Sequence, residues 1–138
     1  MCLLGEPCRY DGKSVPLDGT IIEKLKEKYT LVTVCPEQEG GLPTPRIPAE
    51  RMGENVVRRD GVDVTAEYRK GAEVALSLCR RFGISIALMK AKSPSCGAGR
   101  IYDGTFSGTL TDGDGVTVSL LSGNGIKIFT ENDINSLL

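Results

Sequence analysis

Three cysteines lie far apart in the chain, each in a short loop that contains proline or glycine. Cys2 lies in a loop that reaches a glycine, Cys35 directly precedes a proline, and Cys96 lies in the polar turn 93–97. Thiolates are ligands for soft metals and iron–sulfur clusters. The chain contains no histidine, which excludes Ser-His-Asp and Cys-His catalysis and any histidine-containing zinc site. The three cysteines therefore favour one thiolate site assembled by the fold, and the alternative is that they are small buried hydrophobes.

Two further cysteines bear on the composition of this site. Cys8 follows Cys2 by six residues and could be a fourth ligand, which would give a closed zinc-type site. It could also be a thiol beside the site or a packed residue, and we favour these two interpretations. Cys79 falls on the apolar stripe of a predicted helix, together with Tyr68 and Phe82, so we expect this stripe to face the core. The odd total of five cysteines disfavours a disulfide framework.

Polar residues beside the cysteines could move protons or bind a ligand. Glu37 lies two residues after Cys35 and could serve as a general acid or base. Ser93 and Ser95 could donate hydrogen bonds to a ligand. The loop charges that could orient a polar substrate are Arg9, Asp11, Arg46 and Asp103. Each residue also has a structural alternative, as a solvated charge or a turn-forming hydroxyl.

The apolar pattern predicts strands that alternate with helices. Helices are expected over residues 18–29, 66–82, 116–123 and 131–138, and strands over 31–34, 84–89 and 126–129. Between them we expect a Pro/Gly-rich loop over 35–50, a hairpin over 55–65 and a loop over 90–114. This alternation is typical of a parallel sheet. Cys35 and Cys96 would each follow the carboxyl end of a strand, where open α/β sheets bind ligands.

Length and composition indicate one globular domain over residues 1–138, with 40% hydrophobic and 25% charged residues. A net charge of −1 makes nucleic acid an unlikely partner. The longest apolar runs, of about six residues, are too short to span a membrane. No basic and apolar leader precedes the first cysteine. We therefore expect a cytoplasmic protein, and the sequence leaves both a monomer and a homodimer open.

Four blocks of sequence, taken together and in order, resemble the thiouracil desulfidase (desulfurase) family. They are residues 2–12, 34–46, 93–97 and 101–108, and the similarity runs nearly from end to end. Members of that family carry a strand before the first cysteine motif, whereas only Met1 precedes Cys2 here. The expected fold is therefore a small Rossmann-like, three-layer α/β domain with a short parallel sheet whose first strand is missing.

The resemblance implies a [4Fe–4S] cluster held by Cys2, Cys35 and Cys96, with the fourth iron free for the sulfur of a thiolated nucleobase such as 2-thiouracil. Water would add to the thiocarbonyl carbon, and sulfur would leave as hydrosulfide without net redox change. The acid/base carboxylate and the assisting serine of the family correspond to Glu37 and Ser93. We expect the substrate to be contacted by Ser95, Arg9 and Asp11.

Two other functions are compatible with the same residues. The first is a small zinc-binding structural or interaction module that uses Cys2, Cys8, Cys35 and Cys96. The second is a sulfur-carrier protein that uses its cysteines directly. Iron and sulfide analysis after anaerobic preparation distinguishes both from a desulfidase.

Overall fold

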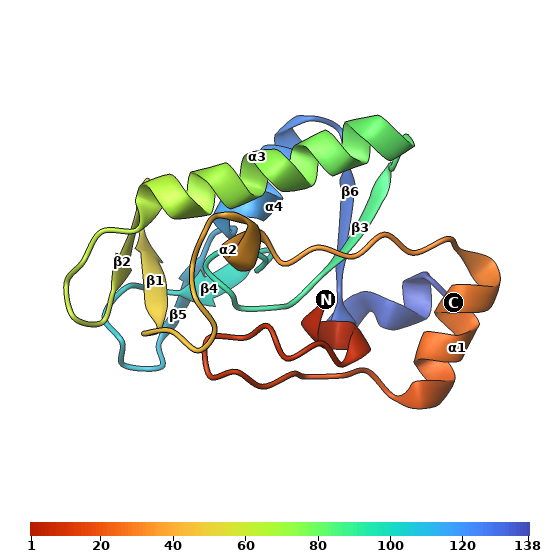
Figure 1. Cartoon of the computed structure of the whole chain (residues 1–138), viewed down its shortest axis with the longest axis horizontal. Coiled ribbons are helices and arrows are strands. Elements are labelled where there is room, and N and C mark those ends of the chain that lie inside the picture. Colours follow the sequence, from red (N-terminus) through yellow and green to blue (C-terminus); the bar gives the residue numbers. More distant parts are fainter.

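The longest element of the computed structural model, which describes residues 1–138, is helix α3 (Thr65–Phe82), which crosses the molecule in Figure 1. Its apolar residues recur at helical spacing and face the core. The helix ends at Gly83, whose φ of 63° is left-handed. Both its extent and its end agree with the prediction from the sequence. Phe82 was expected on the buried face, but it is 55% exposed because it lies in the last turn.

The main hydrophobic core joins α3 to strand β3 (Ile86–Met89) and helix α4 (Val116–Gly123). Its buried members are Ala75, Leu76, Cys79, Met89, Val118 and Leu121. The expectation that Cys79 is a core residue is therefore confirmed. This core fixes α4 and β3 relative to α3. The chain continues from β3 into the cysteine-containing turn 93–97, and the first turn of α4 bonds to the same turn.

The sheets of this mixed α/β fold are short. Strands β3 and β6 (Lys127–Thr130) form a parallel pair, as the sequence predicts. The other two sheets are antiparallel pairs, β1 (Ala49–Met52) with β2 (Asn55–Arg58) and β4 (Arg100–Tyr102) with β5 (Leu110–Asp112).

The amino-terminal third contains little regular structure apart from one helix. The chain starts with a 3-10 helix, η1 (Cys2–Leu4), and continues to α1 (Gly19–Lys28). Helix α1 lies beside the carboxyl terminus in Figure 1, where the Tyr29 hydroxyl donates to the Leu137 carbonyl at 2.8 Å. The last element is a 3-10 helix, η2 (Glu131–Ser136), where the sequence predicted a short helix.

The predicted buried strand at residues 31–34 is wrong. The segment is extended but pairs with no strand, and Leu31 and Val32 are 37% and 41% exposed. None of its backbone N–H groups donates to another backbone carbonyl. Its composition favours a strand, but a strand also needs a hydrogen-bonding partner, and no strand pairs with this segment.

The predictions for two loops and one hairpin also need correction. The segment 35–50 contains a short helix, α2 (Pro36–Glu39), and ends in β1. The hairpin is formed by β1 and β2, and the predicted second arm contributes only a bridge between Val57 and Asp63. The segment 90–114 contains the β4–β5 pair. In each case the missed strand is only three or four residues long and is stabilised by its partner, so local sequence gives little signal.

No helix combines the length and apolar character that crossing a lipid bilayer requires.

Candidate active site

A cavity of about 730 Å³ brings together the cysteines that the sequence places far apart. Cys2, Cys8, Cys35 and Cys96 all line it, as do Glu37 and Ser93. The cavity continues along residues 31–34 and β3. The fold therefore places these distant loops around one cavity.

Helix α2 fixes Cys35 and Glu37. Cys35 precedes the first residue of the helix, and its carbonyl accepts a hydrogen bond from the Glu39 N–H at 3.0 Å. Pro36 occupies the first helical position, where its missing N–H costs nothing. The Cys35 thiol is buried and donates a long, 3.8 Å contact to the Cys8 carbonyl. The thiol and the carboxylate are thus carried by one rigid turn of helix.

The turn that carries Cys96 is fixed by the first turn of α4. The carbonyls of Pro94 and Ser95 accept hydrogen bonds from the N–H groups of Val116 at 2.8 Å and Thr117 at 3.0 Å. A Cβ atom at Gly115 would overlap the Ser95 carbonyl group, so only glycine permits this approach. Cys96 is therefore anchored by the backbone of the helix rather than by its own side chain.

The two serines of this turn have different environments. The Ser93 oxygen accepts hydrogen bonds from the N–H groups of Ser95 and Cys96, both at 3.1 Å, and its own proton stays available for a ligand in the cavity. Ser95 is completely buried, bonds to the Thr117 hydroxyl at 2.8 Å and does not line the cavity. The expectation that Ser95 contacts substrate is wrong, because its side chain faces α4.

The amino-terminal loop brings two more thiols. The Cys2 carbonyl accepts from the N–H groups of Gly5 at 3.1 Å and Val15 at 3.2 Å, so this cysteine is anchored by backbone bonds. Burial raises the pKa of Cys2, and burial together with neighbouring Cys35 raises the pKa of Cys8 to about 12. Burial and the Glu37 carboxylate likewise raise the pKa of Cys96 to about 12. A metal would have to displace the protons of these thiols.

The donor set fits a polynuclear iron–sulfur group better than a single ion. No three of the histidine, cysteine, aspartate and glutamate side chains are grouped closely enough to hold one metal ion. Cys2, Cys8 and Cys96 nevertheless each lie near enough to Cys35 for its charge to raise their pKa. Thiols without imidazole, spread around a cavity much larger than one ion, match the ligand chemistry of a cluster.

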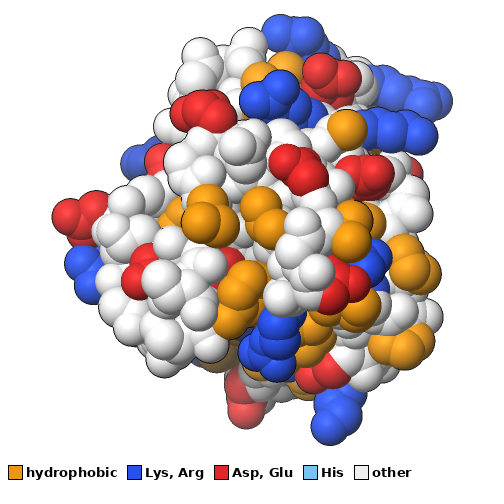
Figure 2. All heavy atoms as spheres, turned by 90° about the vertical axis from the view of Figure 1, so that its left-hand side faces the viewer, with side chains coloured by type: hydrophobic (Ala, Val, Ile, Leu, Met, Phe, Trp, Pro, Cys, Tyr) orange, Lys and Arg blue, Asp and Glu red, His pale blue; other side chains and the backbone are white.

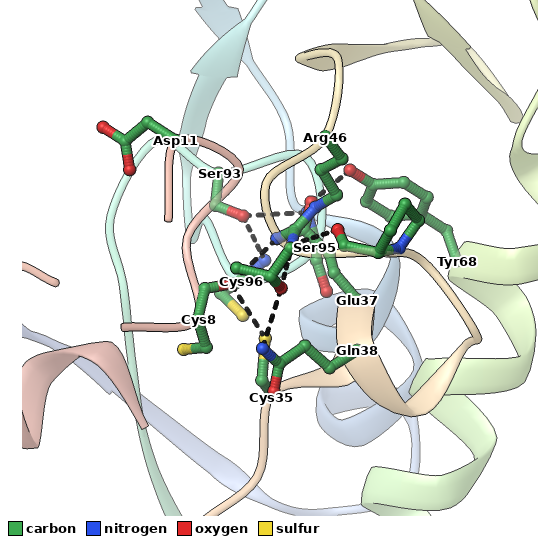
Figure 3. A network of polar contacts seen from close by, with 12 residues as sticks. Cys8, Asp11, Cys35, Glu37, Gln38, Arg46, Tyr68, Ser93, Ser95 and Cys96 are labelled. Carbon is green, nitrogen blue, oxygen red and sulfur yellow. Dashed lines mark hydrogen bonds and ion pairs between the residues drawn. The ribbon is translucent and has the colours of Figure 1, made fainter. Parts of the chain in front are cut away.

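The Glu37 carboxylate is held by two donors that the sequence did not link to it. Arg46 donates from Nη2 to one oxygen at 3.0 Å, and the Tyr68 hydroxyl donates to the other (Figure 3). The sequence placed Tyr68 on the buried face of α3, and it is indeed only 2% exposed. A buried tyrosine hydroxyl needs a partner, which is the one signal that could have pointed to this contact.

The two other predicted substrate contacts differ in position. Arg9 lines the cavity and lies 3.8 Å from the Asp11 carboxylate. Asp11 does not line the cavity, bonds to the Lys13 N–H at 3.0 Å and lies apart from the network in Figure 3. The expectation that Asp11 contacts substrate is therefore not supported, because its carboxylate closes a local turn.

The surface in Figure 2 carries acidic and basic side chains of both signs, interspersed with apolar groups. The view shows no extended field of one sign on this face. This pattern agrees with the net charge of −1 and gives no electrostatic surface there for a nucleic acid.

Comparison with known proteins identifies relatives over almost the whole chain. An "Uncharacterized protein YbbK" of Bacillus subtilis (strain 168) is 40% identical over 147 residues, covering 99% of this chain and 96% of that protein. Among solved structures, the "[4Fe-4S]-dependent thiouracil desulfidase TudS" superposes with a TM-score of 0.94 at 51% identity. That match covers 99% of this chain and 90% of the other. The family model described as 2-thiouracil desulfurase matches residues 1–133. This chain belongs to the 2-thiouracil desulfurase family.

Proposed function

We propose that this protein is a [4Fe–4S]-dependent desulfidase that converts a thiolated nucleobase such as 2-thiouracil into the oxo base and hydrosulfide. Family membership and the similarity to TudS support this activity. The observation that carries it in the structure is the shared cavity, in which thiols face a carboxylate and a hydroxyl. Metal ligands and proton-transfer groups thus share one space.

Cys2, Cys35 and Cys96 would hold the cluster through their thiolates. When bound, the cluster supplies a Lewis-acidic iron for the thiocarbonyl sulfur of the substrate. Cys8 is more deeply buried than Cys2, and its carbonyl accepts from both Cys35 and Arg46. We assign Cys8 a supporting position beside the ligands.

The polar residues of the cavity supply the proton chemistry. The reaction replaces C=S by C=O and consumes one water, whose two protons leave with the sulfur as hydrogen sulfide or its anion. In this proposal the Glu37 carboxylate would accept a proton from that water, and the Ser93 hydroxyl would donate a hydrogen bond to the substrate, since both residues line the cavity. Arg9 lines the same space and could contact the polar edge of the base.

The compartment and the partner follow from the same proposal. All five cysteines are free, which suits the reducing cytoplasm. A small thiolated base fits the cavity, and the face shown in Figure 2 carries charges of both signs rather than a basic patch for RNA. The catalytic unit would be this single chain, as a monomer or within a homodimer.

The test is anaerobic reconstitution with iron and sulfide, followed by analysis of both elements and by a sulfide-release assay on 2-thiouracil. We expect a brown protein with about four irons and hydrosulfide equal in amount to the uracil formed. A colourless protein that holds zinc after anaerobic preparation would contradict the proposal.

Two variants separate the alternatives. A zinc module that uses four cysteines would lose its metal in Cys8→Ala, whereas a cluster held by three cysteines would persist. A sulfur carrier would transfer sulfur after the cluster has been removed, whereas a desulfidase would then be inactive.

A further inference from the structure

Two carboxylates line the cavity, Glu37 and Glu50. Glu50 accepts only from the N–H groups of Gly104 and Phe106 in one loop, whereas Glu37 is held by donors from two different parts of the chain. Tyr68 reaches it from α3, and Arg46 reaches it from the loop that precedes β1. One donor occupies each oxygen of the carboxylate (Figure 3). A carboxylate bound at both oxygens cannot rotate freely about its last side-chain bond, so the direction of its remaining lone pairs is fixed.

The position of Tyr68 depends on close packing between α2 and α3. A Cβ atom at Gly71 would overlap the carbonyl oxygen of Pro36, and one at Gly40 would overlap the carbonyl oxygen of Glu67. Two glycines, Gly71 within α3 and Gly40 directly after the last residue of α2, therefore let the backbones touch. Tyr68 lies three residues before Gly71 on the same face of α3, which directs its hydroxyl toward Glu37.

The state of Tyr68 suits a hydrogen-bond donor. Its side chain is nearly fully buried, and burial followed by the charge of Glu37 raises its pKa. The phenol therefore keeps its proton and donates to the carboxylate. A phenylalanine at this position would fill the same space without the hydroxyl, so the core does not need the oxygen.

Arg46 is held by further hydrogen bonds besides the one to Glu37. Its Nη1 donates to the Pro43 carbonyl and the Thr44 hydroxyl, both at 3.1 Å, and its Nη2 also donates to the Cys8 carbonyl at 3.1 Å. The guanidinium thus ties the carboxylate to the loop of Cys8. Its Nε is the one buried side-chain polar atom without a partner, so the group is placed for its Nη atoms at the expense of Nε.

We propose that Tyr68 and Arg46 are positioning residues that hold the Glu37 carboxylate in one orientation toward the substrate. The proposal rests on the proposed function, since it assigns these residues to the desulfidase reaction. Neither side chain bonds to a cysteine thiol, and both bind the Glu37 carboxylate, so we assign their effect on the reaction to Glu37.

The experiment compares Tyr68→Phe and Arg46→Lys with the wild-type protein. We expect kcat to fall by about 10- to 100-fold in each variant, because a misplaced base loses much of its contribution, while KM changes by less than about threefold. Iron content and the visible spectrum of the cluster should match the wild type. Tyr29→Phe is the matched control, because it removes one hydroxyl that donates to the Leu137 carbonyl and forms no hydrogen bond with Glu37.

A double variant separates positioning from a general structural effect. In a Glu37→Gln background, Tyr68→Phe should cause less than a twofold further loss of kcat, because the group through which it acts is already gone. A crystal structure of Tyr68→Phe should show Glu37 in more than one orientation, a result that does not depend on activity.

Failure of the positioning role and failure of the proposed function give different experimental results. A wild-type protein that retains its cluster but releases no sulfide from any thiobase contradicts the function. A wild-type protein that is active beside an equally active Tyr68→Phe contradicts the positioning role, as does a full additional loss in the Glu37→Gln background.

Discussion

The two walls of the cavity are held in different ways. On one wall, which we call the packed wall, α2 packs backbone to backbone on α3, and the turn 93–97 bonds to the first N–H groups of α4. On the other wall, which we call the open wall, residues 31–34 run extended without a strand partner, and β3 pairs only with β6. Cys35, Cys96 and Glu37 all lie on the first wall. These three groups are therefore carried by elements that close backbone contacts and backbone hydrogen bonds hold in place.

The largest effect is expected at a cysteine of the packed wall. Cys35→Ala should abolish cluster binding and lower sulfide release by more than about 1,000-fold, because a ligand is lost from a rigid site that cannot replace it. Cys79→Ala is the control, since that thiol lies in the hydrophobic core. Iron analysis and the activity assay check both variants. Retention of a full cluster by Cys35→Ala would show that the packed wall does not supply a required ligand.

The next effect concerns the contact between the two helices. Gly71→Ala should destabilise the protein by about 2–4 kcal/mol, because the new methyl group overlaps the Pro36 carbonyl and forces α2 away from α3. Gly123→Ala is the matched control on α4, since no atom lies within 4 Å of the Cβ position there. Urea unfolding of both variants measures the difference. Equal stability of the two would mean that α2 does not depend on this approach.

A smaller effect is expected for Ser93. Ser93→Ala removes the acceptor of two backbone N–H groups and the hydroxyl that faces the cavity, so kcat/KM should fall by about 10- to 100-fold. The unfolding free energy should drop by only about 1 kcal/mol. Ser77→Ala, at an exposed position of α3, is the control. If Ser93→Ala lowers the unfolding free energy but leaves kcat/KM unchanged, the hydroxyl has no role toward the substrate.

The smallest effect is expected on the open wall. Val32→Thr keeps the β-branched shape of an exposed side chain and should change stability by less than about 0.5 kcal/mol and kcat by less than about twofold. Thermal unfolding and the sulfide assay test this. A large loss of activity would show that residues 31–34 support the site as strongly as α2 does, and the contrast between the walls would fail.

The elements that the sequence predicted correctly are those with their own periodic pattern. Helix α3 and strand β6 were recognisable from apolar spacing and from the glycines beside them. The segment 31–34 shows the limit of this approach, because its residues favour a strand whether or not a partner edge exists. The strands β1 and β4 were missed for the converse reason, since they are too short to form without their partners.

The candidate site shows the same division. The cysteines stand out in the sequence because they lie in loops with proline or glycine, and Glu37 and Ser93 were considered because they lie beside them. Tyr68 was recognised only as a core residue, because its partner is distant in the sequence and the hydroxyl–carboxylate contact depends on how two helices cross. Ser95 was assigned wrongly, because neighbouring side chains of a tight turn point in different directions and only the fold shows which one faces α4.

The glycines at the crossing of α2 and α3 have a consequence for protein engineering. Gly40 and Gly71 carry no reactive group, yet they set how far Glu37 stands from α3. A mutant library that varied Gly40 and Gly71 would therefore lose active variants, although neither residue has a catalytic side chain. A design that moves this site onto another scaffold would likewise have to copy the contact between α2 and α3, with glycine at both of these positions, as well as the cysteines.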